Sequence, residues 1–71
     1  MEPLILQQYA AEADRLLAQR CLQVAHQHEI VINLESAGHD SREARKLLQE
    51  FEACLVLQSA DRDRLHRQLG L

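Results

Sequence analysis

The sequence of 71 residues contains no tryptophan, one phenylalanine, one tyrosine, one proline and only two glycines. A chain of this length pays on the order of 100 kcal/mol in conformational entropy on folding. Roughly 4,000 Å² of buried apolar surface is needed to offset that cost, and so few aromatic side chains make this area hard to reach. A second domain is excluded because the chain has about half the length of a typical domain. The shortage of large apolar side chains therefore predicts oligomerisation.

A basic surface is also missing, since eight Lys and Arg residues stand against eleven Asp and Glu residues, a formal net charge of −3. Nucleic-acid modules usually carry a basic face and aromatic stacking platforms, so we expect no nucleic-acid partner. No run of 18 apolar residues occurs, and the start of the chain lacks the positive region of a secretory signal. We therefore expect no membrane partner and a cytoplasmic location, where Cys21 and Cys54 form no disulfide framework.

Signals for β-structure are nearly absent, because no Asn-Gly or Asp-Gly turn occurs and helix-forming residues dominate. One interruption of the helical pattern, residues 36–41, lies near the middle of the chain. Pro3 suits the first turn of a helix. The sequence predicts an all-α protein with a single domain over residues 1–71. Its fold is an antiparallel two-helix hairpin, with helices over about 3–36 and 41–69 and a turn over about 37–40.

The residues of the interruption fit a tight turn between two helices. Gly38 suits the left-handed C′ position that ends many helices. Asp40 is expected to act as the N-cap of the second helix, with Glu43 three positions later completing a capping box. These three residues, Gly38, Asp40 and Glu43, are the predicted turn and cap residues of an αα-hairpin.

Each predicted helix carries an apolar stripe when residues are placed at 100° intervals. Folding the chain about the turn brings the two stripes together as an intramolecular seam, with His28 near Phe51 and both cysteines inside. The stripe of the first helix contains Leu6, Ala10, Ala13, Leu17, Cys21, Val24, His28 and Val31, and that of the second contains Ala44, Leu47, Leu48, Phe51, Cys54, Leu55, Leu65 and Leu69.

A second apolar set remains outside this seam, and a two-helix hairpin has no further layer to cover it. Contiguous exposed apolar surface of this kind marks an interface. We therefore predict a homodimer or higher homo-oligomer in which two hairpins form a four-helix bundle. The proposed oligomer interface consists of Ala18, Leu22, Ala25, Ile32, Ala53, Val56, Leu57 and Ala60.

The sequence offers no catalytic, cofactor-binding or metal-binding pattern. The four histidines lack the i, i+3 or i, i+4 spacing of helical metal sites. His26 and His28 are candidate phosphoacceptors, because histidine titrates near neutral pH. The other interpretation of His28 is a partly buried histidine in the seam. Cys21 and Cys54 are expected to act as small apolar side chains in the seam, and the alternative for them is a redox switch.

The segment from Gln27 to Leu65 resembles a group of small uncharacterised bacterial proteins. The shared features are a Leu-Glu pair, a Gly-His-Asp-Ser/Thr turn, Glu-Ala, Leu-Leu, a phenylalanine and a later Asp-Arg. The resemblance implies a bacterial helical hairpin and carries no activity with it. The residues that carry it are Leu34, Glu35, Gly38, His39, Asp40, Ser41, Glu43, Ala44, Leu47, Leu48, Phe51, Asp61 and Arg62.

Three functions remain open from the sequence. The first is a non-enzymatic module that acts through self-association and through contact with another protein. The second is a small phosphorelay or signalling regulator with an exposed histidine. The third is an enzyme whose site forms between subunits, which would require polar residues to converge in a cleft.

Overall fold

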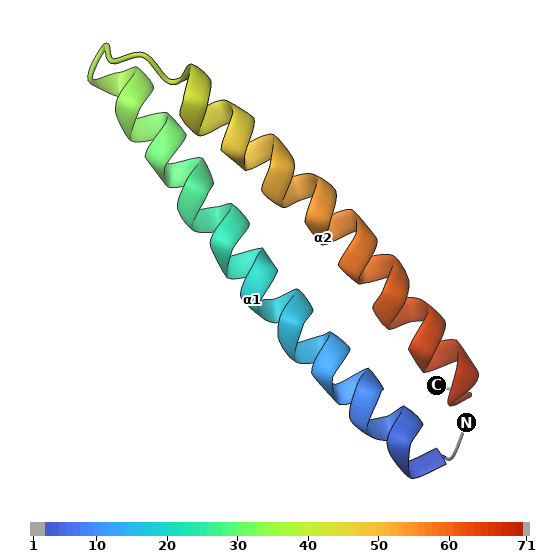
Figure 1. Ribbon diagram of the computed structural model, residues 1–71. Coiled ribbons are helices and arrows are strands. Elements are labelled where there is room, and N and C mark those ends of the chain that lie inside the picture. Colours follow the sequence, from blue (N-terminus) through green and yellow to red (C-terminus); the bar gives the residue numbers. More distant parts are fainter. Residues whose placement is uncertain (1–2, 71) are drawn as a thin grey trace.

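The computed structural model describes residues 3–70, which form two long helices joined by one turn (Figure 1). Helix α1 spans Pro3–Ser36 and helix α2 spans Arg42–Gln68. The helices pack antiparallel against each other along their lengths. The predicted helical hairpin is thus confirmed, and both helices start and end within one residue of the predicted bounds. The predicted domain also includes Met1, Glu2 and Leu71, which lie outside the described residues.

The end of α1 is built as a Schellman motif around Gly38. This glycine has a φ of 76°, which is the left-handed conformation expected at C′. Its N–H donates to the carbonyl of Glu35 at 3.1 Å, and the N–H of His39 donates to the carbonyl of Leu34 at 2.9 Å. These two bonds satisfy the last carbonyls of α1 and turn the chain back toward α2.

The start of α2 differs from the predicted cap by one residue. Ser41 is the N-cap and its side chain makes no capping hydrogen bond. Asp40 lies one residue earlier, where its Oδ1 accepts a 3.0 Å bond from the backbone N–H of Arg42. This bond to the residue two positions on is typical of an aspartate turn, and it keeps the chain non-helical through Ser41. Glu43 lies in the first turn of α2, where its negative charge interacts favourably with the positive end of the helix dipole.

The seam between the helices repeats every seven residues. Its members are the buried and half-buried positions that follow each other at alternating steps of three and four residues, which is the pattern of a coiled coil. A seven-residue repeat lets two helices stay in contact by winding gently around each other. The seam consists of Leu6, Ala10, Ala13, Leu17, Arg20, Val24, Gln27, Val31 and Leu34 on α1, and of Ala44, Leu48, Phe51, Leu55, Gln58, Arg62 and Leu65 on α2, with the cap residues Ser41 and Leu69 at its two ends.

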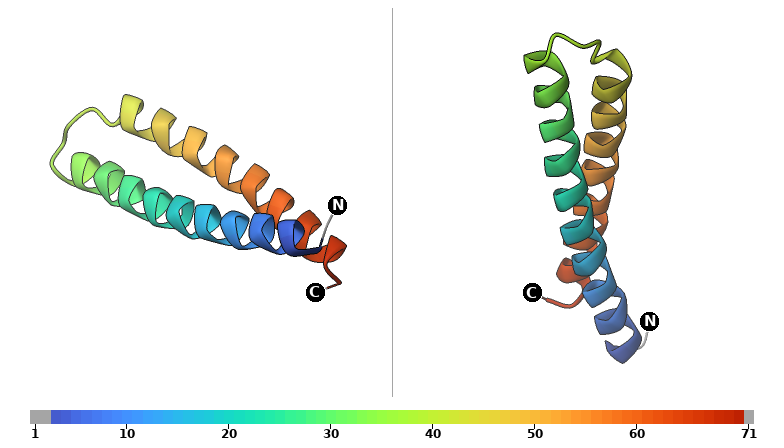
Figure 2. Two further views of the ribbon diagram at one scale, coloured as in Figure 1. Left: turned by 60° about the horizontal axis from the view of Figure 1, so that its bottom comes forward. Right: turned by 90° about the vertical axis from the view of Figure 1, so that its left-hand side faces the viewer.

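The hairpin is a rod with very little interior. It measures 53 × 15 × 14 Å, and its radius of gyration is 16.1 Å, against about 11 Å for a globular chain of this length. Figure 2 shows the two helices side by side from the turn to the open end, crossing at a shallow angle. Among residues 3–70, the buried residues are Leu6, Ala10, Gln27 and Val31 alone, and no side chain is completely buried.

Candidate interaction surface

Two polar side chains occupy seam positions where the sequence suggested apolar or small ones. Gln27 is 6% exposed, and its Nε2 donates a 2.9 Å hydrogen bond to the carbonyl of Ala44. Arg20 donates from Nε to Oε1 of Gln58 at 3.1 Å, and its guanidinium lies over the ring of Phe51, 5.6 Å from the ring centre. These contacts tie α1 to α2 through polar groups near the middle of the rod.

The predicted seam places of Cys21, His28, Leu47 and Cys54 are wrong, because all four residues are exposed. On α1 the predicted stripe and the observed seam share Leu17, Val24 and Val31, so the error is confined to the positions between them. Steps of three and of four residues both stay on one side of a helix. The prediction took the step of four to Cys21 and to His28, whereas the observed seven-residue repeat takes the step of three. Arg20 and Gln27 therefore occupy the seam, each one residue before the predicted Cys21 and His28.

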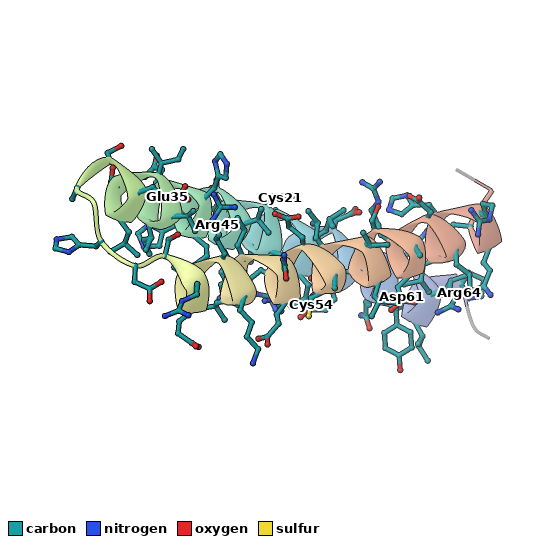
Figure 3. The ribbon with its side chains drawn as sticks, turned by 90° about the horizontal axis from the view of Figure 1, so that it is seen from above. Cys21, Glu35, Arg45, Cys54, Asp61 and Arg64 are labelled. Atoms are coloured by element: carbon teal, nitrogen blue, oxygen red, sulfur yellow. The ribbon has the colours of Figure 1, made fainter. Side chains whose placement is uncertain are left out.

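One side of the hairpin is closed by an ion pair and a histidine–aspartate contact between the two helices; we call it the paired face. Near the turn, the guanidinium of Arg45 binds the carboxylate of Glu35, and near the open end Nε2 of His66 lies 2.9 Å from Oδ1 of Asp14. The hydrogen bonds from Arg45 lower the pKa of the Glu35 carboxyl below its ordinary value. Asp14, Cys21 and Glu35 are separated by multiples of seven residues, so Cys21 lies on this face. Figure 3 shows Cys21, Glu35 and Arg45 on this side.

The opposite side carries most of the large exposed apolar side chains; we call it the apolar face. Figure 3 shows Cys54, Asp61 and Arg64 on this side. On α1, Tyr9, Glu12 and Leu16 line a groove together with Asp61 and Arg64, so they lie on the same side. Positions seven residues apart share a side of a coiled coil, which places the remaining members. Leu16 and Leu47 are 38% and 39% exposed there, and Tyr9 is 53% exposed. The apolar face consists of Ile5, Tyr9, Leu16, Ile30, Leu47, Cys54 and Leu57.

A shallow groove of about 270 Å³ runs along the apolar face near the open end of the hairpin. Ala13 and Leu65 line it from the seam, and Tyr9 and Leu16 line it from α1. Charged side chains also line it: Glu12 binds Arg15 of the same helix, and Arg64 donates to Asp61 at 2.7 Å. Hydrogen bonds from Arg15 lower the pKa of Glu12. The groove therefore has an apolar lining and charges of both signs.

The eight residues of the predicted oligomer interface are all exposed, but they do not form one continuous face. Leu22 is 73% exposed, and Val56 and Leu57 are both 68% exposed. On α1, Ala18, Ala25 and Ile32 follow each other at steps of seven residues on the outer side of the helix. Of the eight residues, Leu57 alone belongs to the apolar face. The other seven, Ala18, Leu22, Ala25, Ile32, Ala53, Val56 and Ala60, make up what we call the outer stripes.

The histidines are distributed along the whole rod. His26 and His28 are exposed on α1, His39 is exposed in the turn, and His66 is half-buried beside Asp14. Within residues 3–70, no group of three or more His, Cys, Asp or Glu side chains is placed to hold a metal ion. In the same range, neither helix has a stretch long and apolar enough to span a membrane.

Comparison of the chain with protein-family models, with curated proteins and with solved structures gave no match. The resemblance to small bacterial hairpin proteins therefore stays a prediction.

Proposed function

We propose that this protein is a small, non-enzymatic interaction module that self-associates into a four-helix bundle and acts through contact with another protein. The observation that supports this most strongly is the amount of large apolar side chain left in solvent. Among residues 3–70, nine large hydrophobic residues are exposed, three of them by about 70%, and three hydrophobic residues are buried. A soluble monomer rarely leaves apolar surface of this extent uncovered.

The accessible surface supports the same proposal. It amounts to 5293 Å², whereas a globular monomer of 8.2 kDa exposes about 4,500 Å². The excess follows from the rod shape, which leaves each helix covered along one side only. A second rod packed alongside would supply the missing layer, as in bundles made from two hairpins.

Size-exclusion chromatography coupled to light scattering tests the self-association. We expect a mass of twice 8.2 kDa or a higher multiple at micromolar protein concentration. Circular dichroism at the same concentration should show a helical spectrum. A chain that is fully helical and monomeric at micromolar concentration would contradict the proposal.

A second candidate function is a phosphorelay or signalling role for His26 or His28. The exposure of both side chains favours it, because a phosphoacceptor must be reached by its donor. Incubation with phosphoramidate, a small phosphoryl donor, would transfer a phosphoryl group to a ring nitrogen and release ammonia. We expect mass spectrometry to find an added phosphoryl group that is lost in His26→Gln or His28→Gln. A signal of equal size in the His39→Gln control and in both variants would show no specific acceptor.

A further inference from the structure

The two faces of the hairpin differ in the rows of residues that flank the seam. On the paired face, polar and charged residues dominate the flanking row of both helices. On the apolar face, five of the eight flanking residues are apolar. The flanking residues of the paired face are Gln7, Asp14, Cys21, His28, Glu35, Arg45, Glu52, Ser59 and His66, and those of the apolar face are Tyr9, Leu16, Gln23, Ile30, Leu47, Cys54, Asp61 and Gln68.

This asymmetry is typical of helices that belong to a bundle. A helix that contacts a single partner needs apolar residues along the seam alone, whereas a helix in a bundle adds one of the two flanking rows. Both α1 and α2 add the row on the same side. That side carries neither of the two described side-chain pairs between Asp or Glu of α1 and Arg or His of α2, because Glu35–Arg45 and Asp14–His66 both lie on the paired face.

From this arrangement we infer that the apolar face is the surface on which a second copy of this chain docks. The inference rests on the proposed self-association and assigns it to the apolar face in place of the outer stripes. The members of the face are spread over most of the rod, from Ile5 and Tyr9 near the open end to Ile30 and Leu47 near the turn. An occupant must therefore be a rod of similar length, which a second hairpin provides.

The size of the face agrees with a stable dimer. The hairpin is 53 Å long and 15 Å wide, so one whole side of it offers roughly 800 Å², which is the area per partner of a standard specific interface. The charges in the groove do not oppose a second copy, because Glu12 and Asp61 are each bound to an arginine. The paired face would stay exposed to solvent in the dimer.

The two native cysteines test the inference without any substitution, because one lies on each face and both are exposed in the single hairpin. The rate of alkylation by N-ethylmaleimide is followed at each cysteine by mass spectrometry, at protein concentrations below and above dimer formation. We expect alkylation of Cys54 to slow by about tenfold or more on dimerisation. Alkylation of Cys21 should change less than about twofold, since the paired face stays open.

Paired charge substitutions give an independent measurement by light scattering. Leu16→Glu with Leu47→Glu alters the apolar face, and Leu22→Glu with Val56→Glu alters the more exposed outer stripes as a matched control. The first variant should raise the dimer dissociation constant by about 100-fold or more, because each leucine contributes a factor of about ten or more. The control should change it by less than about threefold. If the first variant loses its helical spectrum, the alkylation rates decide.

The outcomes separate this inference from the proposed function. A dimer in which Cys21 is protected and Cys54 is not would overturn the inference and leave self-association standing. The same holds if the control variant dissociates as readily as the variant of the apolar face. A wild-type chain that stays monomeric, with both cysteines alkylated at constant rates, would overturn both.

Discussion

Substitution of Gly38 by alanine isolates the energetic cost of the backbone at the turn. The φ of Gly38 is 76°, and a Cβ built on it would meet no atom within 4 Å. Steric collision with the rest of the protein therefore makes no contribution. The cost comes from the left-handed backbone alone, which is about 1–2 kcal/mol for an L-residue with a Cβ.

A smaller effect acts in the opposite direction through the unfolded chain. Alanine has less backbone freedom than glycine when unfolded, which stabilises a protein by about 0.4–1 kcal/mol where the native φ allows it. At Gly38 the strain is the larger of the two, so we expect Gly38→Ala to lower the free energy of unfolding by about 1 kcal/mol. For a chain of this size that corresponds to a fall in Tm of about 4–8 °C.

Gly70 provides a matched control in the same chain. Its φ is 78°, and a Cβ there would also meet nothing within 4 Å. It follows the end of α2, however, where the last turn can unwind to relieve the strain without separating the helices. We therefore expect Gly70→Ala to change the free energy of unfolding by no more than a few tenths of a kcal/mol.

Urea unfolding followed by circular dichroism at fixed protein concentration measures both variants. A chemically synthesised chain with D-alanine at position 38 completes the series, because a D-residue adopts positive φ without strain. It should unfold at a higher urea concentration than the wild type. Equal losses in the Gly38→Ala and Gly70→Ala variants, or no loss in either, would refute the view that the Schellman turn holds the hairpin closed.

Three further predictions concern the contacts between and beside the helices. Gln27→Ala should lower the free energy of unfolding by about 1–2 kcal/mol, because it removes the hydrogen bond to Ala44 and leaves space in the seam. Gln27→Leu fills that space with apolar atoms and should be at least as stable as the wild type. Urea unfolding measures both variants, and an equal loss in the leucine variant would contradict this explanation. Hydrogen bonds from Arg45 and Arg42 lower the pKa values of Glu35 and Asp40, respectively. The stability that these two pairs contribute is therefore complete above the ordinary carboxyl pKa and is lost as the pH falls through the lowered pKa. Glu35→Gln together with Asp40→Asn should flatten the acid side of a plot of stability against pH, and an unchanged curve would argue against both pairs. A double-mutant cycle with Asp14→Asn and His66→Gln should give a coupling of about 0.2–1 kcal/mol, the range of partly exposed pairs, and a coupling of zero would show that the 2.9 Å contact adds nothing.

Local signals were sufficient to predict the hairpin. A single glycine in the middle of the chain, Gly38, a proline in the first turn and the absence of strand patterns define two helices and one turn. The structure places the helix bounds within one residue of those expected. This accuracy has a local cause, because helix ends are determined by a few neighbouring residues whose backbone preferences are strong.

The phase of the seam could not be predicted in the same way, because it depends on how the helices wind around each other. Placing residues at 100° intervals and favouring apolar ones brought Cys21 and His28 to the seam. The structure places Arg20 and Gln27 there, where their polar groups bind Gln58 and the carbonyl of Ala44. Seven-residue spacing alone does not single out this phase. The row Leu4, Ala11, Ala18, Ala25 and Ile32 has the same spacing and is apolar throughout, yet the structure leaves it exposed.

The polar residues in the seam lower the stability of a single hairpin, and this gives the apolar face its importance. A polar side chain at a coiled-coil seam fixes the register of the two helices, and it does so at a cost in stability. The bonds of Arg20 and Gln27 to α2 determine which residues of the two helices lie side by side, but they replace apolar contacts that would have stabilised the hairpin more. A rod with three buried hydrophobic residues and a seam interrupted by polar groups has little stability of its own. Burial of Leu16, Leu47 and their neighbours against a second copy would supply the missing apolar contact, so we expect folding and self-association to be coupled, with a Tm that rises with protein concentration.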